Sequence, residues 1–74
     1  MSVVITRFAT SGLHCPSCSM LIEMEVGGLE GVTGVTVDHR TGVAQVSHDT
    51  DRIRPEDIVA VITKLGYGAE VDSA

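Results

Sequence analysis

The sequence predicts an α+β fold in which two helices cover one face of a four-stranded antiparallel sheet. Two patterns support this prediction. Several segments are rich in Val, Ile and Thr and alternate apolar with polar residues, as strands do. Two other segments carry apolar residues three and four positions apart, as amphipathic helices do. The order of the segments is β-α-β-β-α-β, which is typical of the ferredoxin-like sandwich.

The 74 residues are enough for one small domain, which is expected to span residues 1–74. Hydrophobic residues make up 43% of the chain, but Phe8 and Tyr67 are its only aromatic residues. Aliphatic side chains must therefore fill most of the core. The residues expected to be buried are Val4, Phe8, Ile22, Val26, Leu29, Val35, Val37, Val46, Ile58, Ile62 and Leu65.

The first two predicted elements are a strand and a helix. Residues 3–10 are rich in β-branched side chains and predict the strand. The helix is expected to begin near Pro16, because proline suits the first position of a helix, and to end at Gly27-Gly28. One stripe along the helix is predicted from residues spaced four, four and three apart, namely Cys18, Ile22, Val26 and Leu29.

The remaining elements are a hairpin, a second helix and a short last strand. Residues 32–38 and 43–48 alternate as two strands with a turn between them. The second helix is expected to open at Pro55 and to end at Gly66, which suits the position just after a helix. Residues 67–71 predict the last strand, which completes the sheet.

The charge of the chain excludes some classes of function. Ten acidic and five basic residues give a net charge of −5, which argues against nucleic-acid binding and against docking on an anionic membrane. No apolar run approaches the roughly 20 residues that a membrane helix requires. The first residues lack the pattern of a signal peptide. We therefore expect a cytoplasmic protein.

The two cysteines are three positions apart, in Cys15-Pro16-Ser17-Cys18. A disulfide between cysteines this close would enclose almost no loop, so it could not stabilise a small secreted domain. Metal binding or redox exchange by cytosolic thiols is the better interpretation. Two thiolates suit the soft ion Cu(I), and the backbone N–H groups at the start of the helix favour the thiolate form.

The loop Gly12-Leu13-His14-Cys15-Pro16-Ser17-Cys18 resembles the Gly-Met-x-Cys-x-x-Cys loop of the heavy-metal-associated domain family. The later segments Leu29-Glu30-Gly31-Val32 and Leu65-Gly66-Tyr67 fit the same family. The family comprises small cytosolic copper chaperones and the N-terminal metal-binding domains of metal-transporting P-type ATPases. Leu13 stands where the family usually has Met, and His14 fills a position that is more often small or polar.

The resemblance implies a metal carrier and not an enzyme. Cys15 and Cys18 would hold Cu(I), and an incoming thiolate from a partner would take over the ion by ligand exchange. The implied partner is a metal-transporting P-type ATPase or a copper chaperone. The chain would act as a monomer or as a metal-bridged dimer.

Besides a pure protein-interaction domain, which would not need the cysteines, two alternatives stay open. Cys-Pro-Ser-Cys also resembles the Cys-Pro-x-Cys motif of glutaredoxins, which would make the chain a thiol–disulfide oxidoreductase. The only other proline, Pro55, is placed to start a helix, however, whereas glutaredoxins carry a second proline before a strand. The other alternative is a Zn(II)-binding version of the same domain, in which His14 adds an imidazole ligand.

Several side chains outside the cysteine pair are candidates for supporting roles. His14 is a candidate third ligand, and Tyr67 is a candidate to shield the loop or to hydrogen-bond a cysteine sulfur. Met20 and Met24 are expected to face water opposite Ile22 and to offer a docking patch to a partner. His39 and His48 are expected to be solvated and without a role. The acidic residues Glu23, Glu25 and Glu30 are expected to form a solvated face.

Overall fold

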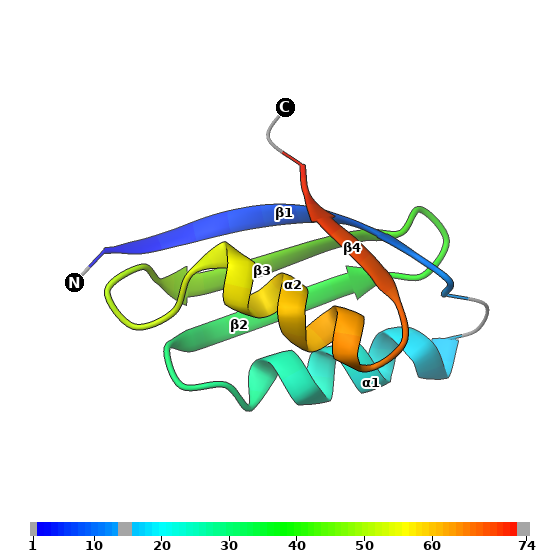
Figure 1. Ribbon diagram of the computed structural model, residues 1–74, viewed down its shortest axis with the longest axis horizontal. Coiled ribbons are helices and arrows are strands. Elements are labelled where there is room, and N and C mark those ends of the chain that lie inside the picture. The colour runs from blue at the N-terminus through cyan, green and yellow to red at the C-terminus, as the bar shows by residue number, and fades with distance from the viewer. Residues whose placement is uncertain (1, 14–15, 73–74) are drawn as a thin grey trace.

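The computed structural model describes residues 2–13 and 16–72, and within them the elements follow the predicted order (Figure 1). The strands and helices, in chain order, are β1 (Val3–Ser11), α1 (Pro16–Gly27), β2 (Val32–Asp38), β3 (Val43–Asp49), α2 (Pro55–Lys64) and β4 (Gly68–Val71). β1 and β3 are each one residue longer than predicted, and β4 begins one residue later.

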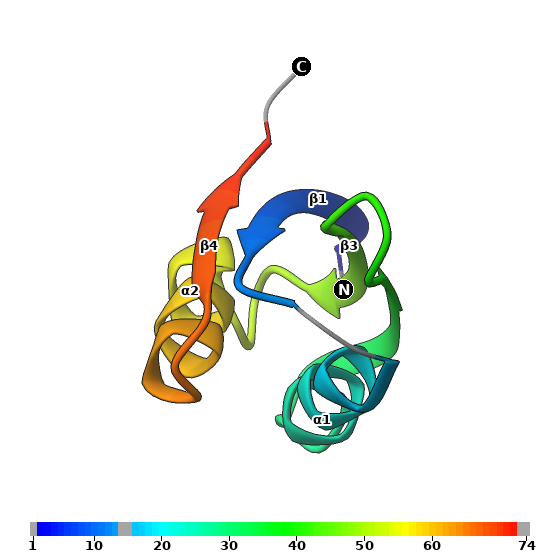
Figure 2. The same cartoon turned by 90° about the vertical axis from the view of Figure 1, so that its right-hand side faces the viewer.

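The strands form one antiparallel sheet in the order β2-β3-β1-β4. Phe8 on the central strand β1 lies opposite Ala44 of β3 and Val71 of β4, which defines the register on both sides. Both helices lie on the same face of the sheet, with α1 packed on β2 and α2 beside β4 (Figure 2). The predicted α+β, ferredoxin-like fold is confirmed.

The core lies between this face of the sheet and the helices. Most of the residues predicted for it are buried, and Leu29, Val35 and Leu65 are half-buried and pack against its edge. Among the described residues, the fully or nearly buried hydrophobic ones are Phe8, Ile22, Val26, Val37, Ala44, Val46, Ile53, Ile58 and Ile62. Ala44 and Ile53 had not been predicted.

Val4 is a wrong prediction, because 42% of its surface is exposed. It lies near the start of β1, which extends past the beginning of α2, so neither helix covers this part of the strand (Figure 1). Its neighbours Val3 and Ile5 are also exposed. The strand pattern predicted the orientation of the side chains but not the length of strand that the helices cover.

His48 is a second correction, because it is fully buried and not solvated. The period of two along β3 places it on the same face as Ala44 and Val46. Its Nε2 lies 2.8 Å from the hydroxyl of Thr6, and its Nδ1 lies 3.2 Å from the carbonyl oxygen of Ile53. Since a carbonyl only accepts, Nδ1 donates to Ile53, and in the neutral ring Nε2 accepts from the Thr6 hydroxyl.

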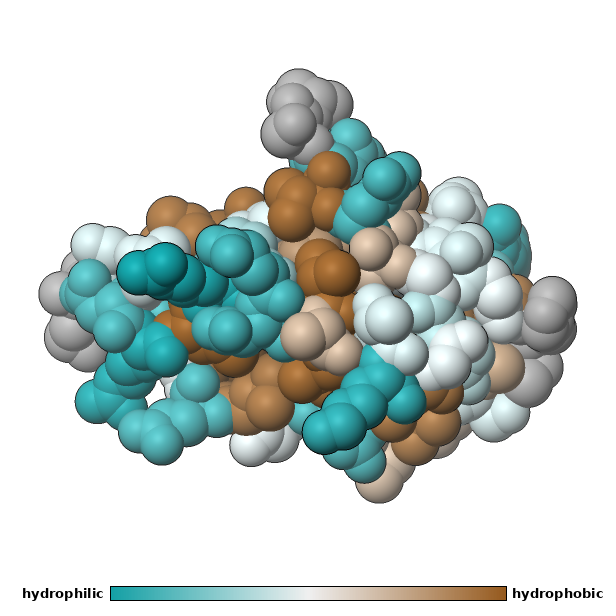
Figure 3. All heavy atoms as spheres, viewed as in Figure 1, coloured by the Kyte–Doolittle hydropathy of each residue, from teal (hydrophilic) through white to brown (hydrophobic). Residues whose placement is uncertain are grey.

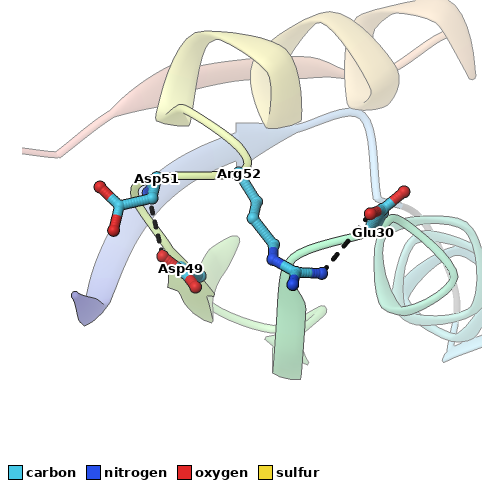
Figure 4. A network of polar contacts seen from close by, with 4 residues as sticks. All are labelled: Glu30, Asp49, Asp51 and Arg52. Carbon is cyan, nitrogen blue, oxygen red and sulfur yellow. Dashed lines mark hydrogen bonds and ion pairs between the residues drawn. The ribbon is translucent and has the colours of Figure 1, made fainter. Parts of the chain in front are cut away.

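A set of polar contacts joins the β3–α2 connector to the segment after α1 (Figure 4). The Asp49 carboxylate accepts the Asp51 N–H at 3.0 Å, and Arg52 lies 3.5 Å from the carboxylate of Glu30. The pKa of Asp49 lies below its ordinary value of 3.8, chiefly because its carboxylate accepts the hydrogen bond from the Asp51 backbone. Asp49 itself is buried among the described residues, whereas Arg52 and Glu30 are exposed.

Candidate metal centre

The cysteine motif falls between β1 and α1 in sequence, and the end of β1 and the start of α1 lie at the end of the molecule that faces the viewer in Figure 2. His14 and Cys15 lie outside the described residues. The structure therefore describes both flanks of the loop, which are Gly12 and Leu13 at the end of β1 and Pro16 to Cys18 at the start of α1.

Cys18 lies in the first turn of α1 and is half-buried. Pro16 is the first residue of the helix, as predicted, and the buried hydroxyl of Ser19 donates to the Pro16 carbonyl at 2.8 Å. The first turn contains no acidic residue. The partial positive charge of the helix start is therefore not neutralised by a carboxylate on that turn, and it favours a negatively charged sulfur there.

Leu13 is half-buried and packs against the hydrophobic core. This is the inward orientation expected for the residue in the Met position of the family motif. The contact ties one flank of the loop to the core, so the chain leaves β1 in a defined direction before the motif begins.

Tyr67 connects α2 to β4 and lies beside the same flank of the loop, at Gly12. Its backbone N–H donates to the Ile62 carbonyl at 3.3 Å, which continues the turn at the end of α2. A Cβ atom built on Gly12 would lie 3.6 Å from Cδ1 of the Tyr67 ring. The aromatic ring is thus in contact range of the backbone two residues before His14.

The β2–β3 turn also reaches this end of the molecule, a feature that the sequence did not reveal. The backbone N–H and the hydroxyl of Thr10 both donate to the carbonyl oxygen of Gly42, each at 2.6 Å. This pair of bonds fastens the end of β1 directly before the cysteine loop. No local pattern signals it, because the partners are 32 positions apart.

Met20 and Met24 are 59% and 71% exposed, whereas Ile22 and Val26 on the opposite side of α1 are fully buried. The predicted rotation of the helix is confirmed. His39, in the β2–β3 turn, is half-buried. Glu23 differs from the expected solvated face, because its carboxylate accepts the backbone N–H of Val37 at 3.0 Å.

Within residues 2–13 and 16–72, no three His, Cys, Asp or Glu side chains come together as a ready-made metal site. The helices in the described part of the chain are too short or too polar to cross a membrane.

The comparisons with known proteins agree on one family. The model of the heavy-metal-associated domain matches residues 7–68. The copper chaperone CopZ of Bacillus subtilis is 38% identical over 56 residues, which are 76% of this chain and 81% of the chaperone. The human copper-transporting ATPase 2 is 37% identical over 68 residues, which are 92% of this chain but 5% of the ATPase.

A solved structure gives the same result at the level of the fold. The copper binding domain from HMA7, a P-type ATPase, superposes with a TM-score of 0.90 at 26% identity, covering 93% of each chain. The match of the family model over most of the chain, the cysteine loop and the shared fold lead to one conclusion. This chain belongs to the heavy-metal-associated domain family.

Proposed function

We propose that this chain binds a soft metal ion, Cu(I), through the thiolates of Cys15 and Cys18 and passes it to a partner by ligand exchange. The observation that carries the proposal is the position of Cys18 in the first turn of α1, directly after a loop that brings Cys15 close in sequence. Membership of the heavy-metal-associated family and the copper proteins among the relatives support the choice of ion.

The donor set explains why such a site both holds and releases its ion. Thiolates are soft ligands that select Cu(I), and two of them leave a position open on the ion. A thiolate of the partner can bind there first, and then the thiolates of this chain leave one at a time. A structural Zn(II) site has four ligands and no such position, and the chain contains only two cysteines.

The supporting side chains have roles in this proposal. Tyr67 shields the loop and hydrogen-bonds a cysteine sulfur, which its position beside Gly12 favours. Met20 and Met24 form the apolar part of the surface that meets the partner, since both are exposed on the helix that follows the loop. His14 stays a candidate third ligand for Zn(II).

We propose that the partner is a metal-transporting P-type ATPase or a copper chaperone and that transfer takes place in the cytoplasm. Residues 1–74 would form one metal-binding domain with no catalytic activity of its own, as a monomer or a metal-bridged dimer. A glutaredoxin-like activity is not favoured, because the family is a metal-binding one and Pro55 opens α2 at the end of the molecule away from the loop (Figure 1).

The test is a titration of the reduced protein with Cu(I) in competition with a chelator of known affinity. Cys15→Ser and Cys18→Ser should each abolish tight one-to-one binding, because a single thiolate cannot replace the pair. Ser17→Ala, between the two cysteines, serves as the matched control and should bind like the parent.

Circular dichroism should show that all variants keep the fold; of the described positions, Ser17 and Cys18 do not belong to the core cluster. Tight Cu(I) binding by either serine variant would contradict the two-thiolate site. Catalytic turnover with a dithiol reductant and a disulfide substrate would instead favour the oxidoreductase.

A further inference from the structure

α1 exposes a pair of thioether side chains that the core does not use. Met20 and Met24 are the most exposed large apolar residues of the helix, while Ile22 and Val26 on its other side are fully buried. Figure 3 shows hydrophobic side chains at the surface along the lower edge of the molecule, where α1 runs. A single exposed apolar residue is ordinary, but these two carry identical sulfur donors one turn apart.

The spacing allows both sulfurs to reach one ion. Side chains at positions i and i+4 of a helix are neighbours, with Cβ atoms roughly 5–6 Å apart. Each methionine has three rotatable bonds and adapts its shape readily. Because both side chains are exposed, they can converge on an ion without moving a residue of the core.

We propose that Met20 and Met24 form a second, weaker soft-metal site that takes Cu(I), or its analogue Ag(I), through two thioether sulfurs. Thioethers are soft ligands that select Cu(I) over Mg²⁺ and Ca²⁺. They carry no proton to lose, so the ion displaces only water. The oxidation state of the metal does not change, and no covalent bond of the protein is formed or broken.

Because its ligands are neutral, this site binds a cation more weakly than a pair of thiolates does. Two anionic sulfurs hold a cation more strongly than two neutral ones, so the methionine pair accepts an ion only when the cysteines are occupied or absent. At a rise of about 1.5 Å per residue, Met20 and Met24 lie roughly 3 and 9 Å beyond Cys18 along the helix axis. An ion held there is close to the cysteine loop, and the net charge of −5 attracts it.

The inference rests on the proposed function only in that soft metal ions reach this chain. Its test therefore uses the full chain with Cys15→Ser and Cys18→Ser, in which the thiolate site is absent. The chain contains three methionines, Met1, Met20 and Met24. With ¹³C-labelled methionine methyl groups, Ag(I) should shift the signals of Met20 and Met24 together, to a one-to-one end point, and leave that of Met1 in place.

Two kinds of variant make the test specific. Met20→Leu and Met24→Leu keep the volume of the side chain, and each should weaken Ag(I) binding at least tenfold. The matched control is the exchange Met24→Leu with Leu21→Met, which keeps the composition but moves the sulfur beside Met20, where adjacent side chains do not face each other. This double variant should bind as weakly as Met24→Leu alone.

The outcomes separate the two sites. If Ag(I) shifts neither signal, shifts all three alike, or binds equally well to the exchanged variant, the methionine site is wrong. None of these results bears on the cysteines, which the tested protein lacks. Conversely, loss of Cu(I) binding at the cysteines leaves the methionine pair intact in the same assay.

Discussion

The imidazole of His48 links three parts of the chain from inside the core. It is fully buried on β3, and its two ring nitrogens meet the hydroxyl of Thr6 on β1 and the carbonyl of Ile53 in the connector before α2. A buried polar group without a partner is costly. Both nitrogens of this ring are satisfied, so the side chain contributes to the packing of the core instead of weakening it.

His48→Ala is expected to lower the free energy of unfolding by about 3 kcal/mol, because it leaves a cavity and two polar groups without their partner. Thr6→Val, which removes one hydrogen bond at constant volume, should cost about 1 kcal/mol. His39→Ala, in the β2–β3 turn, is the control and should change stability by less than about 0.5 kcal/mol. Urea unfolding followed by circular dichroism measures all three, and equal effects at positions 39 and 48 would contradict the buried network.

The role of His14 is tested by comparing two metals. Zn(II) prefers four ligands including nitrogen, whereas two thiolates satisfy Cu(I). His14→Ala is therefore expected to weaken Zn(II) binding detectably and to leave Cu(I) affinity within about tenfold, or roughly 1.4 kcal/mol. Competitive titration of both ions measures this. A much larger loss of Cu(I) affinity would identify His14 as a true third ligand of copper.

At the scale of the elements, α1 and β2 are joined by more than apolar packing. β2 is an edge strand of the sheet, so one row of its backbone groups has no neighbouring strand. Glu23 of α1 accepts the Val37 N–H on this strand at 3.0 Å, which satisfies a backbone donor near the edge. α1 thus makes apolar contacts with the sheet and also accepts a hydrogen bond from a backbone N–H of its edge strand.

Glu23→Ala is expected to destabilise the fold by about 1 kcal/mol, because Val37 loses a charged acceptor and gains only water in its place. Glu25→Ala, at an exposed position of the same helix, removes the same charge and should change stability by less than about 0.5 kcal/mol. Chemical denaturation at neutral pH compares the two. Amide hydrogen exchange at Val37 should accelerate only in the Glu23 variant, and the same exchange rate in both would exclude the contact.

At the scale of the whole molecule, the two ends of the fold are organised differently. One end brings together the last residues of β1, Tyr67 and the β2–β3 turn, with Thr10 bonded to Gly42 just before the cysteine loop in sequence. At the other end, the contacts of Asp49 and Arg52 hold the α1–β2 and β3–α2 connections together (Figure 4). The proposed metal site and these polar contacts therefore lie toward opposite ends of the sheet.

Asp49 makes the stability of the whole fold depend on pH. Its pKa is lowered below 3.8 in the folded state, so its contribution to stability is present above the ordinary pKa and disappears as the pH falls through the folded value. Asp49→Asn should therefore be less stable than the parent at pH 7, and the difference should shrink below about pH 4. Urea unfolding at several pH values measures this convergence.

Glu70→Gln is the control for the Asp49 experiment, because it removes one exposed carboxylate from β4. Unlike Asp49→Asn, it should not show a loss of stability at pH 7 that shrinks below about pH 4. A difference between Asp49→Asn and the parent that stays constant from pH 7 to pH 3 would show that the folded carboxylate is not favoured by the Asp51 contact.

The sequence by itself determined the order of the elements, the start of α1 at Pro16 and the buried side of that helix. These features follow from local patterns: proline at the first helical position, and the three- and four-residue spacing that buries Ile22 and Val26 and exposes Met20 and Met24. The position of Cys18 in the first helical turn followed from the same signals, since it needs no knowledge of distant contacts.

The tertiary structure alone decided which side chains these elements bring together. The exposure of Val4, the burial of His48 against Thr6 and the bond from the Val37 N–H to Glu23 all depend on how strands and helices overlap. The bonded partners are 42 and 14 positions apart, and a local pattern carries no information about contacts over such separations. Sequence periodicity gives the face of an element, but only packing determines what covers that face.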